Sequence, residues 1–208
     1  MNARFANWAH VASLIGLTVA AHASCADPLA LPAHHHETLV AAPMPGESLY
    51  QLRITLETAT GTTVPLEYFR GGPLLITMFY THCTSVCPML TADLKRLDAA
   101  LSPHQRSKLR VLMVSLDGPR DTPAELTHFV NEHGIADPRW SLARASADDV
   151  RLMAATLGIR YRELPDHSFN HSAIITLVDK DGLLRARTTD LLRMDEDFAR
   201  ALTASLGP

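Results

Sequence analysis

One stretch constrains the fold more than any other, an apolar run from Pro73 to Tyr80 that leads directly to Cys83 and Cys87. A continuous run of this length is typical of a strand buried on both faces, in the middle of a partly parallel sheet. Beyond the cysteines, apolar residues recur at helical intervals as far as Leu97. The stretch therefore predicts a buried strand that delivers two thiols to the start of a helix.

The rest of the chain continues the alternation of strands and helices. The pattern predicts the order β, β, α, β, α, β, α, a β-hairpin and a last α. Predicted strands cover 49–56, 74–80, 109–116, 140–143, 172–178 and 183–188, with a further extended piece at 159–164, and predicted helices cover 85–101, 122–133, 148–157 and 194–206. This alternation indicates an α/β protein with a mixed central sheet, flanking helices and a C-terminal β-hairpin. A thioredoxin-like fold follows the same order, with its thiol pair where the central strand meets its helix.

The N-terminus predicts export from the cytoplasm. Residues 1–23 contain one Arg, an apolar run from Val11 to Ala21, and Ala21-His22-Ala23 as a cleavage pattern. The run is shorter than the roughly 20 apolar residues of a comfortable membrane span. Because Phe5 to Ala26 has no formal charge, an uncleaved membrane anchor stays as the alternative.

Residues 24–46 are rich in Ala and Pro and predict a flexible linker. Its histidines, His34 to His36, could bind a metal ion or simply form a solvated polar tract. The remaining residues, 47–208, are expected to form one domain. We expect this domain in the periplasm or another extracytoplasmic compartment, soluble or tethered to the inner membrane. The formal net charge of -3 gives no basic surface for nucleic acid.

Cys83 and Cys87 form the only cysteine pair of the predicted domain, since Cys25 lies at the processing site. A disulfide closing so short a loop removes little entropy from the unfolded chain and would stabilise the fold poorly. Reversible redox chemistry or metal binding explains the pair better. Residues four apart on a helix share one face, and a helix N-terminus favours thiolates. Thiolates are soft ligands that select Cu(I).

Two sulfurs alone make a marginal site for copper in both of its oxidation states, so a nitrogen ligand is expected. Two histidines near the C-terminal hairpin are candidates, His167 and His171. His171 directly precedes the predicted strand 172–178, where a fixed backbone could aim its imidazole, and His167 lies in the preceding loop.

Taken together, these motifs resemble the Sco (SenC/PrrC) family of exported copper chaperones for cytochrome c oxidase assembly. The matching pieces are Phe79 to Cys83 with Cys87-Pro88, Val114 to Asp117 with Arg120 to Pro123, Trp140 to Leu142, and His171-Ser172 followed by Asp179 to Gly182. The chain departs from the family pattern at Thr84, where relatives carry Pro, and at Asn170, where they carry Asp.

The resemblance implies a thioredoxin-like domain that binds one copper ion through two cysteines and a distal histidine. Carried over to this chain, the ligands are Cys83, Cys87 and His171, the histidine being selected by the eight-residue distance to Asp179. The implied role is to deliver copper to the binuclear copper site of cytochrome c oxidase subunit II, or to prepare the cysteines of that site. Another exported copper protein is the alternative partner, and we expect a monomer.

A different class of function uses the same thiols. Cys83 and Cys87 could cycle as the redox pair of a thiol:disulfide oxidoreductase that acts on partner cysteines without metal. The sequence leaves open whether the protein is an enzyme in this sense.

Several neighbouring residues have simpler expected roles. Met78 and Met113 are expected to lie in the core, and Met89 is expected to pack near the site, with a soft neighbour of the thiols as the alternative. His82 could tune Cys83 electrostatically or act as an additional ligand. Asp117, Arg120 and Asp121 are expected to brace a loop through ion pairs and helix caps.

Overall fold

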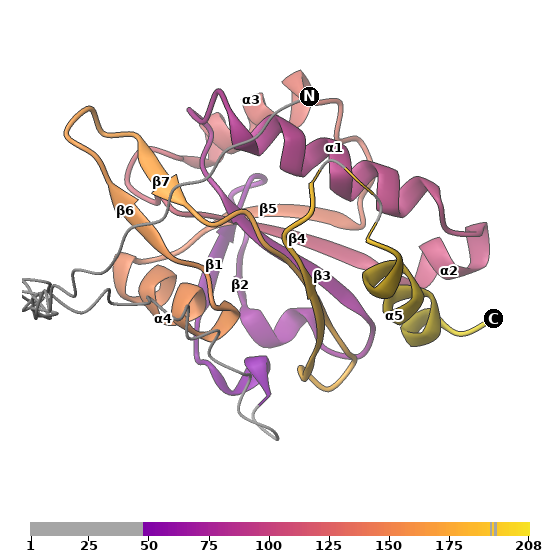
Figure 1. The fold of residues 1–208 in the computed structure, drawn as a ribbon. Coiled ribbons are helices and arrows are strands. Elements are labelled where there is room, and N and C mark those ends of the chain that lie inside the picture. Colours follow the sequence, from indigo (N-terminus) through magenta and orange to yellow (C-terminus); the bar gives the residue numbers. More distant parts are fainter. Residues whose placement is uncertain (1–47, 192, 194) are drawn as a thin grey trace, which may run out of the picture. The chain divides into compact units, whose positions relative to one another are not determined.

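The computed structural model describes residues 48–208 except residues 192 and 194. In this part of the chain a seven-stranded mixed sheet carries helices on both of its faces (Figure 1). The predicted signal at 1–23, the linker at 24–46 and the histidines His34 to His36 lie outside the described residues.

The sheet is built around β3, the strand that the apolar run predicts. β3 (Leu74–Phe79) is buried at every position and pairs in parallel with β4 (Arg110–Ser115), which pairs in parallel with β5 (Trp140–Arg144). The remaining strands pair antiparallel: β8 (Ile175–Val178) and β9 (Leu184–Thr188) beside β3, and β1 (Thr55–Thr58) and β2 (Thr63–Pro65) beside β5. The order is β2-β1-β5-β4-β3-β8-β9, which confirms the predicted mixed sheet and C-terminal hairpin.

The helices divide between the two faces of this sheet. α1 (Val86–Ala99), α3 (Pro123–Glu132) and α5 (Glu196–Leu206) contribute to the apolar cluster on one face, whereas α4 (Ala147–Leu157) and the 3-10 helices η1 (Leu49–Gln51) and η2 (Leu66–Phe69) contribute to the cluster on the other. β3 serves both clusters because successive side chains of a strand point to opposite faces. Leu75 and Phe79 belong to the first cluster, and Met78 belongs to the second, where it is buried as predicted.

Helix ends follow the signals in the sequence. The Thr122 side chain accepts a hydrogen bond from the Glu125 amide, with Pro123 in the first turn of α3. Gly158 ends α4 at a φ of 70°, a left-handed conformation that glycine adopts without strain.

Three local predictions were wrong. Residues 49–51 form η1 rather than strand, because Ser48 accepts a hydrogen bond from the Tyr50 amide while the Leu49 amide bonds the Gly182 carbonyl at 2.7 Å. α2 (Pro103–Lys108) lies where no helix is predicted, and it begins at a capping box formed by Ser102 and Gln105. The third error concerns 172–178, where β8 begins only at Ile175.

Ahead of β8 the chain forms a separate two-stranded sheet. β6 (Tyr161–Glu163) pairs antiparallel with β7 (Phe169–His171), and Tyr161 lies opposite His171. We call residues 161–171 the β6–β7 hairpin. Only its first strand overlaps the extended piece predicted at 159–164.

Candidate metal centre

Cys83 lies in the turn between β3 and α1, where its sulfur takes the part of a helix cap. The Ser85 side chain, at the N-cap position of α1, makes no capping hydrogen bond. Instead the Cys83 Sγ accepts a hydrogen bond from the Cys87 amide at 3.3 Å, which satisfies one of the free N–H groups of the first turn. Cys83 therefore precedes the helix instead of sharing a helical face with Cys87, and the capping contact is what brings it close to the first turn.

The two thiols differ sharply in acidity. Hydrogen bonds from the Cys87 thiol and from the Ser85 and Cys87 amides lower the pKa of Cys83 against the effect of burial. The same bond to Cys83, together with burial, raises the pKa of Cys87. Both cysteines are buried free thiols. The directions of the two shifts favour the thiolate at Cys83 and the protonated thiol at Cys87.

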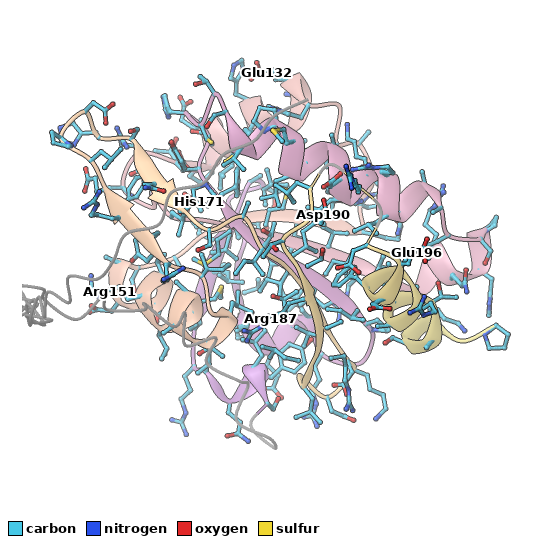
Figure 2. The ribbon with its side chains drawn as sticks, in the orientation of Figure 1. Glu132, Arg151, His171, Arg187, Asp190 and Glu196 are labelled. Atoms are coloured by element: carbon cyan, nitrogen blue, oxygen red, sulfur yellow. The ribbon has the colours of Figure 1, made fainter. Side chains whose placement is uncertain are left out.

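His171 ends β7 (Figure 2), and its imidazole lies close to the two cysteines. Its Nε2 lies 3.8 Å from the Cys87 Sγ, and its Nδ1 lies 3.2 Å from the Ser172 carbonyl oxygen. Because a carbonyl only accepts, Nδ1 carries the proton and donates it in this bond. The lone pair on Nε2 is then directed to the sulfurs, which is the arrangement of a metal-binding histidine.

Geometry and donor chemistry of the three side chains fit a soft metal ion. The two sulfurs of Cys83 and Cys87 and a ring nitrogen of His171 all lie within 4.8 Å of one another. Bonds of about 2.3 Å to sulfur and about 2.0 Å to nitrogen would place such ligand atoms roughly 3.5–4 Å apart. The three side chains would need to move only slightly to enclose an ion, and two thiolates with one imidazole favour Cu(I) or Zn²⁺ over hard cations.

The other histidine candidates do not join this group. The imidazole of His167 is exposed and its Nδ1 lies 2.7 Å from the Glu163 carboxylate. His82 is exposed too, with its Nδ1 3.0 Å from the Thr81 hydroxyl and 4.0 Å from the Asp121 carboxylate. Met89, which is predicted to pack near the site, is 38% exposed, whereas Met113 is buried as predicted.

A buried carboxylate fixes the turn that carries Cys83. Asp121 is fully buried and accepts hydrogen bonds from the Thr81 amide at 3.0 Å and from the Thr81 and Ser115 hydroxyls, each at 2.5 Å. Burial raises the pKa of Asp121, although these hydrogen bonds oppose the rise. Parallel pairing of β3 with β4 puts the two loops side by side, since the Leu116 amide bonds the Phe79 carbonyl at 2.7 Å. Asp121 braces the loop as predicted, but through hydrogen bonds to Thr81 and Ser115 instead of an ion pair or a helix cap.

Tyr80 and Phe169 belong to the site, although nothing in the sequence distinguishes them from ordinary core aromatics. Tyr80 is buried at the end of β3, and its ring lies 5.3 Å from that of Phe169 and 5.9 Å from that of His171. Its hydroxyl donates a hydrogen bond of 3.5 Å to the Phe169 carbonyl. Tyr80 thus connects the central strand with the β6–β7 hairpin.

A buried central strand that ends in a thiol pair at a helix N-terminus, within a mixed sheet, defines the thioredoxin-like class of proteins. A histidine converging on the pair distinguishes this member of the class from a plain dithiol protein. The SCO1/SenC family model matches residues 44–206. The chain therefore belongs to the SCO1/SenC family.

Individual relatives are distant in sequence. A Bacillus subtilis SCO1 protein homolog is 24% identical over 132 residues, which are 62% of this chain and 67% of that protein. Matched segments of the curated relatives make up between 46% and 67% of their own lengths.

Solved structures agree with the fold. Bradyrhizobium japonicum ScoI with copper bound has a TM-score of 0.62 and 25% identity, covering 73% of this chain and 96% of that one. BsSco, described as a member of the Sco family of cytochrome c oxidase assembly proteins, has a TM-score of 0.63 and 19% identity, covering 74% of this chain and 92% of that one.

Within residues 48–208 as described, no helix is both long and apolar enough to cross a membrane.

Proposed function

We propose that this protein is a copper chaperone that holds one copper ion with Cys83, Cys87 and His171. The observation that carries the proposal is the convergence of two sulfurs and one imidazole nitrogen within 4.8 Å. ScoI, a relative at 25% identity, has copper bound in its solved structure. The lowered pKa of Cys83 favours one thiolate before metal binding, and the Cys87 proton leaves when Cu(I) enters.

The proposed recipient is the binuclear copper site of cytochrome c oxidase subunit II, or another exported copper protein. The description of BsSco as one of the cytochrome c oxidase assembly proteins supports this choice. We further propose that residues 1–23 direct export or anchor the chain, that 24–46 form a linker, and that 47–208 work outside the cytoplasm as a monomeric domain.

A second function is favoured by the unequal acidity of the two thiols. The Cys83 thiolate can attack a partner disulfide, forming a mixed disulfide and releasing one partner thiolate, which takes up a proton. Cys87, once it loses its own proton, then attacks the Cys83 sulfur and releases the second partner sulfur. The partner disulfide is reduced, and Cys83 and Cys87 are oxidised to a disulfide.

Copper stoichiometry and visible spectra of single variants test the proposal. Wild-type protein is expected to bind one copper ion, and Cys83→Ser, Cys87→Ser and His171→Ala should each weaken binding by more than about 100-fold, since even outer partners of a ligand are worth 10–100-fold. His167→Asn, which removes the competing imidazole and suits the left-handed backbone at that position, should still bind one copper ion.

Two outcomes would contradict the three-ligand proposal. Copper binding by His171→Ala as tight as that of wild type would remove the histidine from the site. Full reduction of a partner disulfide by metal-free His171→Ala, with no measurable copper binding by wild type, would establish the second function instead. His128→Ala is the matched control, because His128 is an exposed histidine outside the site and its removal should leave copper binding unchanged.

A further inference from the structure

The β6–β7 hairpin carries His171 but belongs to a different sheet from the strand that leads to the cysteines. It is an isolated pair of three-residue strands, Tyr161–Glu163 and Phe169–His171. Two-stranded hairpins are at best marginally stable on their own in water. Contacts from outside the hairpin must therefore determine where the imidazole lies relative to the sulfurs.

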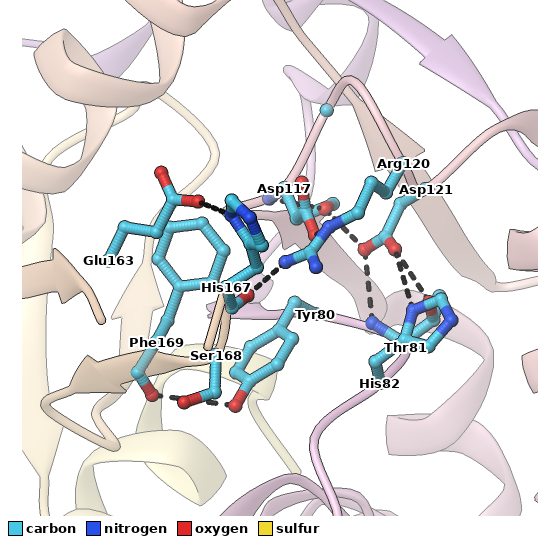
Figure 3. Close-up of polar contacts among 12 residues, drawn as sticks. Tyr80, Thr81, His82, Asp117, Arg120, Asp121, Glu163, His167, Ser168 and Phe169 are labelled. Carbon is cyan, nitrogen blue, oxygen red and sulfur yellow. Dashed lines mark hydrogen bonds and ion pairs between the residues drawn. The ribbon is translucent and has the colours of Figure 1, made fainter. Parts of the chain in front are cut away.

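One such contact is made at the tip of the hairpin by an arginine. The Arg120 guanidinium donates a hydrogen bond to the His167 carbonyl and pairs with the Asp117 carboxylate (Figure 3). His167 has a φ of 62°, unusual for a residue with a side chain. Within the turn, the His167 amide bonds the Leu164 carbonyl at 2.9 Å and the Leu164 amide bonds the Ser168 carbonyl at 2.8 Å.

The loop that supplies Arg120 also binds the segment that carries Cys83. Asp121, the next residue, accepts hydrogen bonds from the amide and the hydroxyl of Thr81, two residues before Cys83. In loop 117–121 the Arg120 side chain therefore contacts the β6–β7 hairpin, and the adjacent Asp121 side chain contacts the segment that leads to Cys83. The ion pair with Asp117 orients the Arg120 guanidinium, and β4, which is parallel to β3, holds the loop beside β3.

We propose that Arg120 is a positioning residue, which holds the β6–β7 hairpin so that His171 stays within bonding range of a metal held by Cys83 and Cys87. This inference deepens the proposed copper-binding function and rests on it. Arg120 need not touch the metal, because its guanidinium acts on the hairpin through the His167 carbonyl.

Amide hydrogen exchange in the metal-free protein gives a test that does not depend on copper. Arg120→Ala should speed exchange in residues 161–171 by about 10-fold or more while leaving β3 and β4 unchanged. Arg151→Ala is the matched control, because Arg151 forms the same i,i+3 ion pair, with Asp148, but that pair lies on the exposed face of α4. Arg120→Lys keeps the charge and should restore part of the protection.

Copper binding supplies the second measurement. Arg120→Ala should weaken copper binding about 10-fold, which is the lower end of the loss in metal affinity seen when a residue that orients a ligand is removed. It should also shift the Cu(II)–thiolate absorption band toward that of His171→Ala. When Arg120→Ala is added to His171→Ala it should cause no further loss, because the ligand that Arg120 positions is already gone.

The outcomes separate this inference from the proposed function. Wild-type exchange and affinity in Arg120→Ala would overturn the positioning role while leaving the copper site intact, and an additive loss in the double variant would overturn it as well. A wild-type protein that binds no copper would refute the proposed function, and hairpin exchange would still decide whether Arg120 holds the hairpin. Should Arg120→Ala fail to fold, the same measurements on Arg120→Gln decide the question.

Discussion

At the scale of single residues, Cys83 combines two tasks that are usually separate. Its sulfur caps the helix in place of the usual side-chain oxygen, because it accepts a hydrogen bond of 3.3 Å from the Cys87 amide. It is also a proposed ligand. The capping contact favours the charged form of the thiol, because hydrogen bonds to a thiolate lower its pKa. The fold therefore prepares one anionic ligand before any metal arrives.

This charge predicts a specific pattern of alkylation. In reduced, metal-free protein, iodoacetamide should modify Cys83 before Cys87, because the pKa of Cys83 is lowered and that of Cys87 is raised. The rate should change little between pH 8 and pH 6, since Cys83 remains a thiolate there. A cysteine of ordinary pKa, about 8.5, slows close to 100-fold over this range. Peptide mapping across pH measures the effect, with a short cysteine peptide as the control, and first modification at Cys87 would contradict it.

At the scale of elements, the β8–β9 turn shows how one carboxylate organises a connection. The Asp179 Oδ1 accepts the Asp181 and Leu183 amides, each at 2.9 Å, and its Oδ2 accepts the Arg185 Nε at 2.7 Å. Burial works against the charged form, but these hydrogen bonds prevail and lower the pKa of Asp179. Gly182 closes the turn at a φ of 89°, and an added Cβ there would lie 2.6 Å from the Tyr50 ring.

Removing this carboxylate should cost stability in a manner that depends on pH. A depressed pKa in the folded state contributes stability above the unfolded value, about 3.9, and that contribution is lost as pH falls through the folded pKa. Asp179→Ala should lower the free energy of unfolding by about 1–2 kcal/mol at pH 7, the worth of the lost hydrogen bonds. Urea unfolding should show the gap to wild type narrowing below about pH 4. A gap that stays constant down to pH 2 would show that the charge is not responsible.

At the scale of the whole domain, the thiols are continuous with the core. Cys83 and Cys87 belong to the apolar cluster that also contains Phe79, Leu94 and Phe198, so it joins the central strand to α1 and α5. A metal bound by these cysteines and His171 stabilises the folded state more than the unfolded chain, in which the histidine is not held beside the cysteines.

Copper should accordingly raise the melting temperature. At a free Cu(I) concentration 100 times the dissociation constant, the folded state gains about 2.7 kcal/mol. For a domain of this size each kcal/mol moves the midpoint by about 2–4 °C, so a rise of roughly 5–10 °C is expected. Anaerobic calorimetry with buffered Cu(I) measures it. At the same Cu(I) concentration His171→Ala should show a much smaller rise, and equal shifts in both proteins would contradict the role of the histidine.

Sequence reasoning found those parts of the molecule that local patterns encode. The apolar run of β3, the Thr122 cap and the Gly158 stop each reflect physics within a few residues. The β6–β7 hairpin could not be predicted from local patterns, because Phe169 forms a strand only by pairing with Glu163 and packing on Tyr80, which is 89 residues away in the chain. Likewise, the sequence showed Arg120 as part of a brace, but its contact with the His167 carbonyl exists only in the tertiary structure.

The distance along the chain between the ligands has a consequence for the order of events in the life of the protein. Cys87 and His171 are 84 residues apart, and β4, β5 and the three helices α2, α3 and α4 lie between them in the chain. A chain that has not yet folded offers two cysteines and a detached histidine. Only the finished domain offers all three together. The complete three-ligand set is therefore a property of the finished fold and of no shorter segment of the chain.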